Sequence, residues 1–285
     1  PLPRGVEVKG PTLIRGQADR LAHLEVVFAE QPHRQQSLIR RVHIDQRLAP
    51  QIGSFPTIVR HIEHRVGRDC KAGRSGADIL TLAARHGVHI LGASGPVFTA
   101  ARPVNRATLY GPSGIVGHQD KLIMTRFERE TWHVVAGAGL PVFDTPLGRI
   151  GVLICYDSEF PLLARRMVEQ GAEVLLVPSC TDSLAGFTRV RVGTMERALE
   201  NQCITVQAPT VGLAPWCPAV DENVGAAAIY GPPDHGFPPT GILAETALNQ
   251  PGWALAEVDL AAIHAVRRDG GVLNHLHWSE QHDRL

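Results

Sequence analysis

The sequence predicts an α/β fold in which helices cover the faces of β-sheets, and three observations point to it. From residue 77 onward, short runs of apolar and β-branched residues alternate with amphipathic stretches. Several runs are apolar at nearly every position, as strands buried on both faces are. Hydrophobic residues make up 44% of the 285 residues and charged residues 20%, which is enough for a buried core. We therefore expect a layered α/β domain over residues 77–285.

The predicted strands share a composition rich in Val, Ile, Leu, Ala or Thr, and most of them end at turn-forming residues. In chain order they cover 88–94, 106–112, 151–157, 173–179, 203–209, 226–232 and 253–260. Sequential strands separated by helical stretches favour sheets whose helices pack on a face.

Two helices are expected between these strands. The first covers 161–170 and begins at Pro161, a residue that suits the first helical position, with Ser158 or Glu159 available as a cap. The second covers 188–201. In it, Val192, Met195 and Leu199 recur at spacings of three and four.

Residues 1–76 differ from the rest in composition and charge. They contain 13 Lys/Arg and 7 Asp/Glu, whereas residues 77–285 contain 15 and 21. Their periodicity is weak and suggests only a strand over 23–30 and a helix over 35–48. We expect residues 1–76 to be an atypical basic segment, partly disordered. Because no nucleic-acid motif or aromatic platform accompanies the charge, we expect no nucleic-acid partner.

Cys155 is predicted to lie at the end of strand 151–157, just before the helix that begins at Pro161. Free amides and the dipole at a helix N-terminus favour a thiolate over a thiol. A nucleophilic thiol needs a base, but no histidine lies between Cys155 and His235, and no G-x-C-x-G sequence is present. A Cys-His pair is therefore poorly supported, and another base is required.

Two stretches around this cysteine resemble a known family. "GHQDKLIMTRFERETW" (117–132) and "GLPVFDTPLGRIGVLICYDSEFP" (139–161) are similar to the lysine and cysteine motifs of the carbon-nitrogen hydrolase, or nitrilase, superfamily. The similarity extends over about residues 79–278. It implies a four-layer α-β-β-α sandwich of the nitrilase type, a Glu-Lys-Cys triad, and a homodimer or higher homo-oligomer.

Matched by position, the resemblance implies that Cys155 is the nucleophile and Lys121 the catalytic lysine. Glu128 matches an additional active-site glutamate, and the amide of Tyr156 would share the oxyanion hole with Lys121. An ammonium group beside a thiol lowers its pKa and stabilises the oxyanion. A glutamate can accept the thiol proton, pass it to the leaving amine, and later activate water.

The general base is where this sequence departs most from the family pattern. Family members place it in a Pro-Glu pair after an early strand, and the nearest match is Glu30 in "VVFAE", where Ala29 stands in place of proline. Glu25 and Glu63 are weaker candidates, because neither ends a clear strand. One hypothesis is that residues 1–76 replace the usual start, for example through translation in a wrong reading frame, which would leave the fold incomplete and the base absent.

Other residues are candidates for the walls of the site. Cys180 follows strand 173–179, and Arg189 and Arg191 follow the next loop, where either arginine could bind a carboxylate. The loops expected to shape the substrate site are 94–104, 181–188, and 212–224, which contains Trp216 and Cys217. Cys203 is expected in the core, and Cys70 has no assigned role.

The predicted function is a thiol hydrolase that cleaves a non-peptide C–N bond of a small amide through a Cys155 thioester, releasing ammonia or an amine. A nitrile hydrolase is the near alternative, but nitrilases proper more often have Trp where this chain has Tyr156. An impaired member or binding protein that lacks the base is the other alternative.

No cofactor and no metal are expected. His275 and His277 would share one face of a strand, but their spacing supplies no third ligand. The five cysteines are dispersed without a C-x-x-C pair, and no leader or membrane span is visible, so we expect a cytoplasmic protein without a membrane partner.

Overall fold

A computed structural model of the chain describes residues 76–99, 102–215 and 220–285. Within these residues, a four-stranded antiparallel sheet is centred on β3. The strand β4 pairs along β3, whereas β1 and β2 pair with its two ends. The strands are β1 (Ile90–Leu91), β2 (Gly95–Phe98), β3 (Pro103–Gly111) and β4 (Gly114–Asp120). We call this the β3 sheet.

A six-stranded sheet has the order β12-β11-β8-β7-β6-β5. Its centre, β6-β7-β8, is parallel, and the flanking strands are antiparallel. The strands are β5 (Phe143–Thr145), β6 (Gly148–Val152), β7 (Val174–Ser179), β8 (Ile204–Pro209), β11 (Ala228–Tyr230) and β12 (Ile242–Glu245). We call this the β7 sheet. All six residues of β7 are buried, which explains the continuous apolar run at 173–179.

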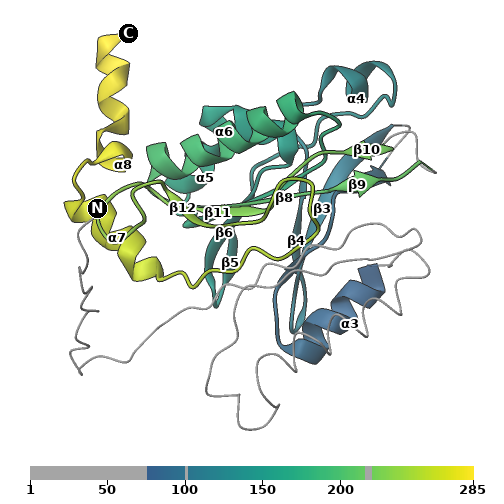
Figure 1. Cartoon of the computed structure of the whole chain (residues 1–285), viewed down its shortest axis with the longest axis horizontal. Coiled ribbons are helices and arrows are strands. Elements are labelled where there is room, and N and C mark those ends of the chain that lie inside the picture. Colours follow the sequence, from purple (N-terminus) through teal and green to yellow (C-terminus); the bar gives the residue numbers. More distant parts are fainter. Residues whose placement is uncertain (1–75, 100–101, 216–219) are drawn as a thin grey trace, which may run out of the picture.

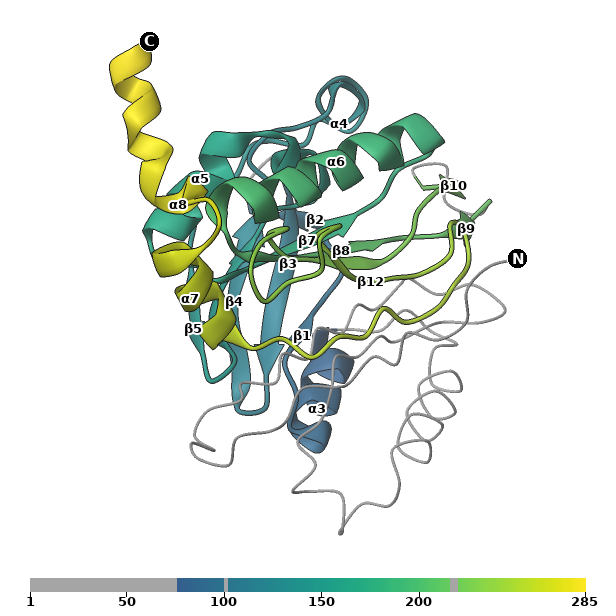
Figure 2. The same ribbon diagram turned by 60° about the vertical axis from the view of Figure 1, so that its left-hand side comes forward.

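Helices cover the outer faces of the two sheets (Figures 1 and 2). The helices α5 (Pro161–Glu169) and α6 (Leu184–Asn201) connect the parallel strands and pack on the β7 sheet through an apolar cluster that includes Met167, Leu175 and Val190. The helix α3 (Gly76–His86) packs on the β3 sheet through a cluster that includes Ile79 and Tyr110.

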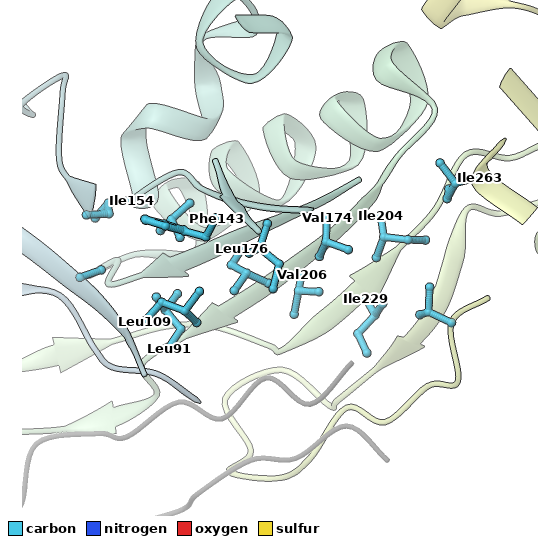
Figure 3. Close-up of a cluster of buried hydrophobic side chains, with 14 residues drawn as sticks. Leu91, Leu109, Phe143, Ile154, Val174, Leu176, Ile204, Val206, Ile229 and Ile263 are labelled. Carbon is cyan, nitrogen blue, oxygen red and sulfur yellow. The ribbon is translucent and has the colours of Figure 1, made fainter. Parts of the chain in front are cut away.

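The main core lies between the two sheets, as Figure 3 shows. Leu91 and Leu109 from the β3 sheet meet Val174, Leu176 and Ile204 from the β7 sheet. The layers therefore run helix, sheet, sheet, helix. This confirms the predicted four-layer α-β-β-α sandwich for the described residues, whereas the weak elements proposed at 23–30 and 35–48 lie outside them.

The remaining elements are short, apart from one helix. The two-residue strands β9 (Gly212–Leu213) and β10 (Glu222–Asn223) form a separate hairpin. The helices are α4 (Arg126–Glu130), η2 (Cys155–Glu159), α7 (Leu260–Asp269), α8 (Asn274–His277) and η3 (Trp278–Arg284). None of the helices in the described ranges is long and apolar enough to cross a membrane.

Two predicted strands differ from the structure. Residues 253–259 form no strand, although Val258 is buried in the core. The strand expected at 151–157 instead covers Gly148–Val152, and the chain turns into η2 before it reaches the end of the motif. A short apolar run does not by itself select an extended backbone.

The helix predictions were right in position and wrong in detail. The helix α5 begins at Pro161 as predicted, but Phe160 is its N-cap, so neither proposed cap residue acts as one. In α6, Val192 and Leu199 are exposed, and the buried face instead includes small and polar residues such as Gly193 and Thr194. Close approach of α6 to the turn at Ser158 and Glu159 requires Gly193, because a Cβ there would lie 2.9 Å from the Ser158 carbonyl oxygen.

The C-terminal histidines lie on a helix, which corrects the predicted strand. His275 and His277 belong to α8. The backbone N–H of His275 donates to Gln202 Oε1, and its carbonyl accepts from Arg165 Nη1. Burial, together with nearby arginines, lowers the pKa of His275 to about 4.

Candidate active site

The candidate nucleophile lies in a strained turn at the carboxyl end of β6. Cys155 is the first residue of η2 and has a φ of 50°, a conformation that is costly for a residue with a side chain. The Ser158 hydroxyl donates to the Cys155 carbonyl at 2.7 Å, and Arg197 Nη1 donates to the Ser158 carbonyl at 3.0 Å. A Cβ at Gly193 would lie 2.9 Å from that same carbonyl oxygen, so α6 rests directly on the turn.

The candidate lysine follows β4 directly, and its backbone is fixed on both sides. The Lys121 N–H donates to the Asn105 carbonyl at 2.8 Å, and the Lys121 carbonyl accepts from the Gly137 N–H at 2.9 Å. Its side chain is only 3% exposed, and its ammonium group lies 2.6 Å from Glu128 Oε2. Burying an ammonium group against a single carboxylate costs free energy of folding. We expect a protein to keep such a pair where the position of the ammonium group is needed.

Glu128 is held by a capping box at the start of α4. Thr125 is the N-cap, and its N–H and hydroxyl donate to Glu128 Oε2 at 2.8 and 2.9 Å. Asn105 Nδ2 donates to the other carboxylate oxygen at 3.3 Å. Burial alone would raise the pKa of Glu128, but the Lys121 ammonium and the Thr125 hydrogen bonds outweigh it and hold that pKa below its usual range.

The pKa of the Cys155 thiol is raised, whereas its place before a helix N-terminus led us to expect a lowered one. Cys155 is half-buried as a residue, yet the protein around its sulfur is dense enough that burial raises the pKa of the thiol. The charge of Lys121 and the backbone amide of Tyr156 oppose this shift without cancelling it. The thiol instead donates to the Cys180 carbonyl, with the sulfur 3.6 Å from that oxygen. A base must therefore remove its proton during reaction.

Asp157 is a buried carboxylate at this site to which sequence reasoning gave no role. It is 1% exposed, and it accepts hydrogen bonds from the backbone N–H groups of Leu122, at 3.2 Å, and Ile123, at 2.8 Å. Burial raises the pKa of Asp157 to about 6, although both amides act in the opposite direction. The "CYD" sequence was quoted within the cysteine motif, but nothing in it indicated that the Asp reaches the lysine loop.

Cys180 lies beside the thiol, at the end of β7. Its carbonyl accepts from Cys155, and its sulfur lies 3.1 Å from Asn223 Oδ1. The hydroxyl of Thr210 donates to that same Asn223 oxygen at 2.6 Å, which connects the β9–β10 hairpin to the ends of β7 and β8. The sequence thus placed Cys180 at the site and missed Asn223 and Thr210, which are distant in sequence and belong to no motif.

The remaining sequence-predicted residues are less closely connected to the thiol. Arg189 is 64% exposed and lies 3.7 Å from Glu159, and Arg191 pairs with Glu245 at 2.7 Å. Cys203 is fully buried in the core as expected, and burial raises its pKa to about 12. Several predicted residues lie outside the described part of the chain, namely Glu25, Glu30, Glu63, Cys70, Trp216 and Cys217.

The described residues include no group of three or more His, Cys, Asp or Glu side chains placed to hold a metal ion. The polar groups brought together are a thiol, an ammonium group and two carboxylates, Glu128 and Asp157. This set suits nucleophilic attack with stabilisation of a developing negative charge.

The chain belongs to the carbon-nitrogen hydrolase family, whose family model matches residues 70–268. A relative from Bacillus subtilis described as "Probable hydrolase YhcX" is 38% identical over 191 residues, which cover 67% of this chain and 37% of the relative. A deaminated glutathione amidase from Yersinia enterocolitica is 31% identical over 147 residues, covering 47% of this chain and 51% of that protein. The chain thus spans about half the length of these curated relatives, or less.

Solved structures of this superfamily have the same fold. A carbon-nitrogen hydrolase from Helicobacter pylori is 18% identical and covers 87% of this chain and 93% of its own, with a TM-score of 0.61. The NitFhit protein of C. elegans is 25% identical and covers 72% of this chain and 50% of its own, with a TM-score of 0.57. The layered sandwich is therefore the nitrilase-type fold.

Proposed function

We propose that this chain is an amidase-type hydrolase that cleaves the C–N bond of a small amide through a thioester on Cys155. The observation that carries the proposal is the buried Lys121–Glu128 ion pair whose charges act on the Cys155 sulfur. Neither a structural thiol nor a surface lysine requires such an arrangement. Membership of the carbon-nitrogen hydrolase family and relatives named as amidases support the same reaction.

In the proposed reaction, the Cys155 sulfur attacks the amide carbon while a carboxylate takes the thiol proton. Negative charge then develops on the substrate oxygen, where the Lys121 ammonium and the Tyr156 N–H stabilise it. Collapse of this intermediate breaks the C–N bond, and the stored proton leaves with ammonia or an amine. Water then attacks the thioester, with a carboxylate accepting its proton, and releases the acid and the thiol.

The two candidate proton acceptors differ in what supports them. Glu128 lies in the described site, but its lowered pKa makes it a weak acceptor for a thiol whose own pKa is raised. This mismatch favours a separate base, and we propose Glu30 for that role, with Glu128 fixing Lys121. If Glu30 does not fulfil it, Glu128 must act alone or the chain binds amides without turnover.

Amides are favoured over nitriles because the relatives that carry a specific activity in their names include amidases from several organisms. One relative is named as a nitrilase, and it matches over only 34% of this chain. A cytoplasmic homodimer that acts on a small-molecule amide is the form of the protein that we propose.

The test is release of ammonia from a panel of small amides and nitriles by the wild type and by Cys155→Ala. We expect hydrolysis of at least one amide by the wild type and a loss of at least about 10³-fold in the variant. Cys203→Ala, which removes a thiol from the core, serves as the control and should retain activity while it is folded. Equal activity of Cys155→Ala and wild type would contradict the thiol mechanism.

The thioester gives a second readout in the same experiment. Mass spectrometry of the acid-quenched wild type with a turned-over amide should find the acyl group on Cys155 alone. A protein that binds an amide at this site but releases no ammonia and forms no adduct would support the binding-protein alternative instead.

A further inference from the structure

The turn that carries Cys155 and the loop that carries Lys121 are connected by one buried side chain. Asp157, two residues after the cysteine, accepts the N–H groups of Leu122 and Ile123, which directly follow the lysine. Residues 121–123 belong to no helix or strand, so no regular hydrogen-bond ladder satisfies these two amides. The carboxylate supplies the acceptors that a strand or helix would otherwise provide.

From this geometry we propose that Asp157 is a positioning residue, which sets the distance and orientation between the Lys121 ammonium and the Cys155 thiol. The proposal rests on the reaction proposed above, because only that reaction needs the two groups in a fixed relation. No role in proton transfer is assigned to Asp157, whose acceptor sites face the backbone of the lysine loop.

The burial of Asp157 supports this interpretation over a role in general stability. A carboxylate that is 1% exposed and held by two amides at 2.8–3.2 Å pays a desolvation cost that an uncharged acceptor would avoid. The raised pKa, about 6, reports that cost. This cost is accounted for if Asp157 fixes how the lysine loop and the cysteine turn meet, because a buried polar group can specify a single arrangement of the segments that it joins.

The backbone strain at Cys155 also supports a positioning role for Asp157. Its φ of 50° persists only if the surrounding contacts fix it. Ser158 and Arg197 hold the turn from the side of α6, and Asp157 holds it from the side of the lysine loop. Loss of the Asp157 acceptor would therefore release Leu122 and Ile123 from the turn and remove the support of the turn on that side.

The test uses the alkylation of Cys155 by iodoacetamide, followed by peptide mass mapping, in wild type and Asp157→Asn. The amide side chain keeps the shape but turns one acceptor into a donor that faces an N–H. Displacing Lys121 from the thiol should raise the thiol pKa, and one pKa unit corresponds to about a 10-fold slower reaction at neutral pH. We expect a decrease of about that size or more.

Asp234→Asn is the matched control. Asp234 also accepts three backbone N–H groups, from His235, Gly271 and Val272, but it follows β11 at the end of the β7 sheet opposite to Cys155. Because three backbone donors lose their charged acceptor, Asp234→Asn should lower the melting temperature, and it should leave Cys155 alkylation unchanged. Alkylation of both variants at the wild-type rate would overturn the proposal.

The direction of the change excludes a purely electrostatic role. If Asp157 acted only through its negative charge, its removal would favour the thiolate, and Asp157→Asn would react faster than wild type. A faster reaction would therefore also overturn the proposal. A slower reaction together with an unchanged KM and a lowered kcat for an amide would support it.

The wild type provides a test that does not depend on the variant folding. Lys121, which follows β4, is the charged group that acts on Asp157. Glu128 on α4 is paired with that lysine, Glu159 lies in the same turn as Asp157, and Arg197 on α6 donates to the Ser158 carbonyl of that turn. Protonation of Asp157, whose pKa is raised to about 6, turns one of its two acceptor oxygens into a hydroxyl and so weakens its hold on the Leu122 and Ile123 N–H groups. The logarithm of the alkylation rate should then fall with pH more steeply below pH 6 than above it, and a constant slope would overturn the proposal.

Alkylation needs no substrate, so this experiment and the ammonia assay fail independently. An inactive wild type whose thiol still responds to Asp157→Asn would reject the amidase and retain the positioning role. An active wild type whose Cys155 alkylation rate is unchanged by Asp157→Asn would retain the amidase and reject the positioning role.

Discussion

Two regions of the site each bury a carboxylate near Cys155, and they hold it in opposite ways. At the start of α4, Glu128 contacts an ammonium group, a hydroxyl and a backbone amide, and its pKa is lowered. In the turn after β6, Asp157 contacts two backbone amides, and burial raises its pKa. Glu128 is held by the Lys121 ammonium group, which takes part in the proposed chemistry, whereas Asp157 is held by backbone N–H groups.

This difference gives the two residues opposite effects on stability as pH changes. A carboxyl group whose pKa is lowered on folding, such as Glu128, stabilises the protein above its unfolded pKa, and this contribution is lost as pH falls through the folded pKa. Asp157 has a raised pKa of about 6, so its ionisation opposes folding above that pH, and stability increases as pH falls from 6 toward the unfolded value. The ionised Glu128 carboxylate therefore adds to the free energy of unfolding, whereas the ionised Asp157 carboxylate lowers it and is tolerated for its geometry.

The largest effect should follow from breaking the ion pair of the first region. Lys121→Met removes the ammonium group and leaves the Glu128 carboxylate buried without its charge partner. We expect a loss of about 3–5 kcal/mol in the free energy of unfolding, measured by urea denaturation, because an uncompensated buried charge is strongly destabilising. Amide hydrolysis should fall by about 10²–10³-fold or more, since an oxyanion donor is lost.

The double variant Lys121→Met/Glu128→Gln separates these two losses. Neutralising both partners should restore most of the stability, because no unpaired charge remains, while activity stays low. Recovery of activity in the double variant would contradict the assignment of Lys121 to the reaction. Stability that stays as low as in Lys121→Met would indicate that packing, and not the buried charge, caused the loss.

Glu128→Gln alone should have the next largest effect on activity. If Glu128 is the proton acceptor, hydrolysis should fall by about 10²–10⁴-fold. If it only fixes Lys121, the loss should be smaller, and Glu30→Gln should show the larger one. The free energy of unfolding of Glu128→Gln should also decrease less on acidification than that of the wild type, because the titrating carboxylate is gone. Identical acid dependence in the two proteins would contradict the lowered pKa.

The same comparison explains how much of the fold and site could be predicted from the sequence. Four strands of the β7 sheet, namely β6, β7, β8 and β11, and the residues Cys155, Lys121 and Glu128 lie in local patterns and motifs, and the structure brings these three residues together. The short edge strands β5 and β12 were not predicted. Asp157 was missed because its partners are backbone N–H groups, which leave no side-chain pattern to find.

Other differences have the same physical origin. The buried face of α6 was not predicted by Val192 and Leu199, which are exposed, because close contact with the turn requires Gly193 on that face and Thr194 packs beside β8. Residues 253–259 are apolar enough to resemble a strand, yet only Val258 among them is buried and the segment makes no strand pairing. An apolar pattern in the sequence therefore fixes neither the burial of each residue nor the backbone hydrogen bonds that it makes.

The smallest expected effect concerns the hydroxyl that completes the capping box of the first region. Thr125→Ala removes the N-cap acceptor for the Glu128 N–H and one donor to its carboxylate, whereas the Thr125 N–H and Lys121 remain. We expect a loss of about 1 kcal/mol in the free energy of unfolding, with activity reduced far less than in Glu128→Gln. Thr125→Ser, which keeps the hydroxyl, should lie close to wild type in a melting experiment. If Thr125→Ser and Thr125→Ala are equally destabilised, the methyl group and not the cap carries the effect. If Thr125→Ala matches Glu128→Gln in activity, the hydroxyl, and not the ammonium group, is what holds the Glu128 carboxylate in its working position.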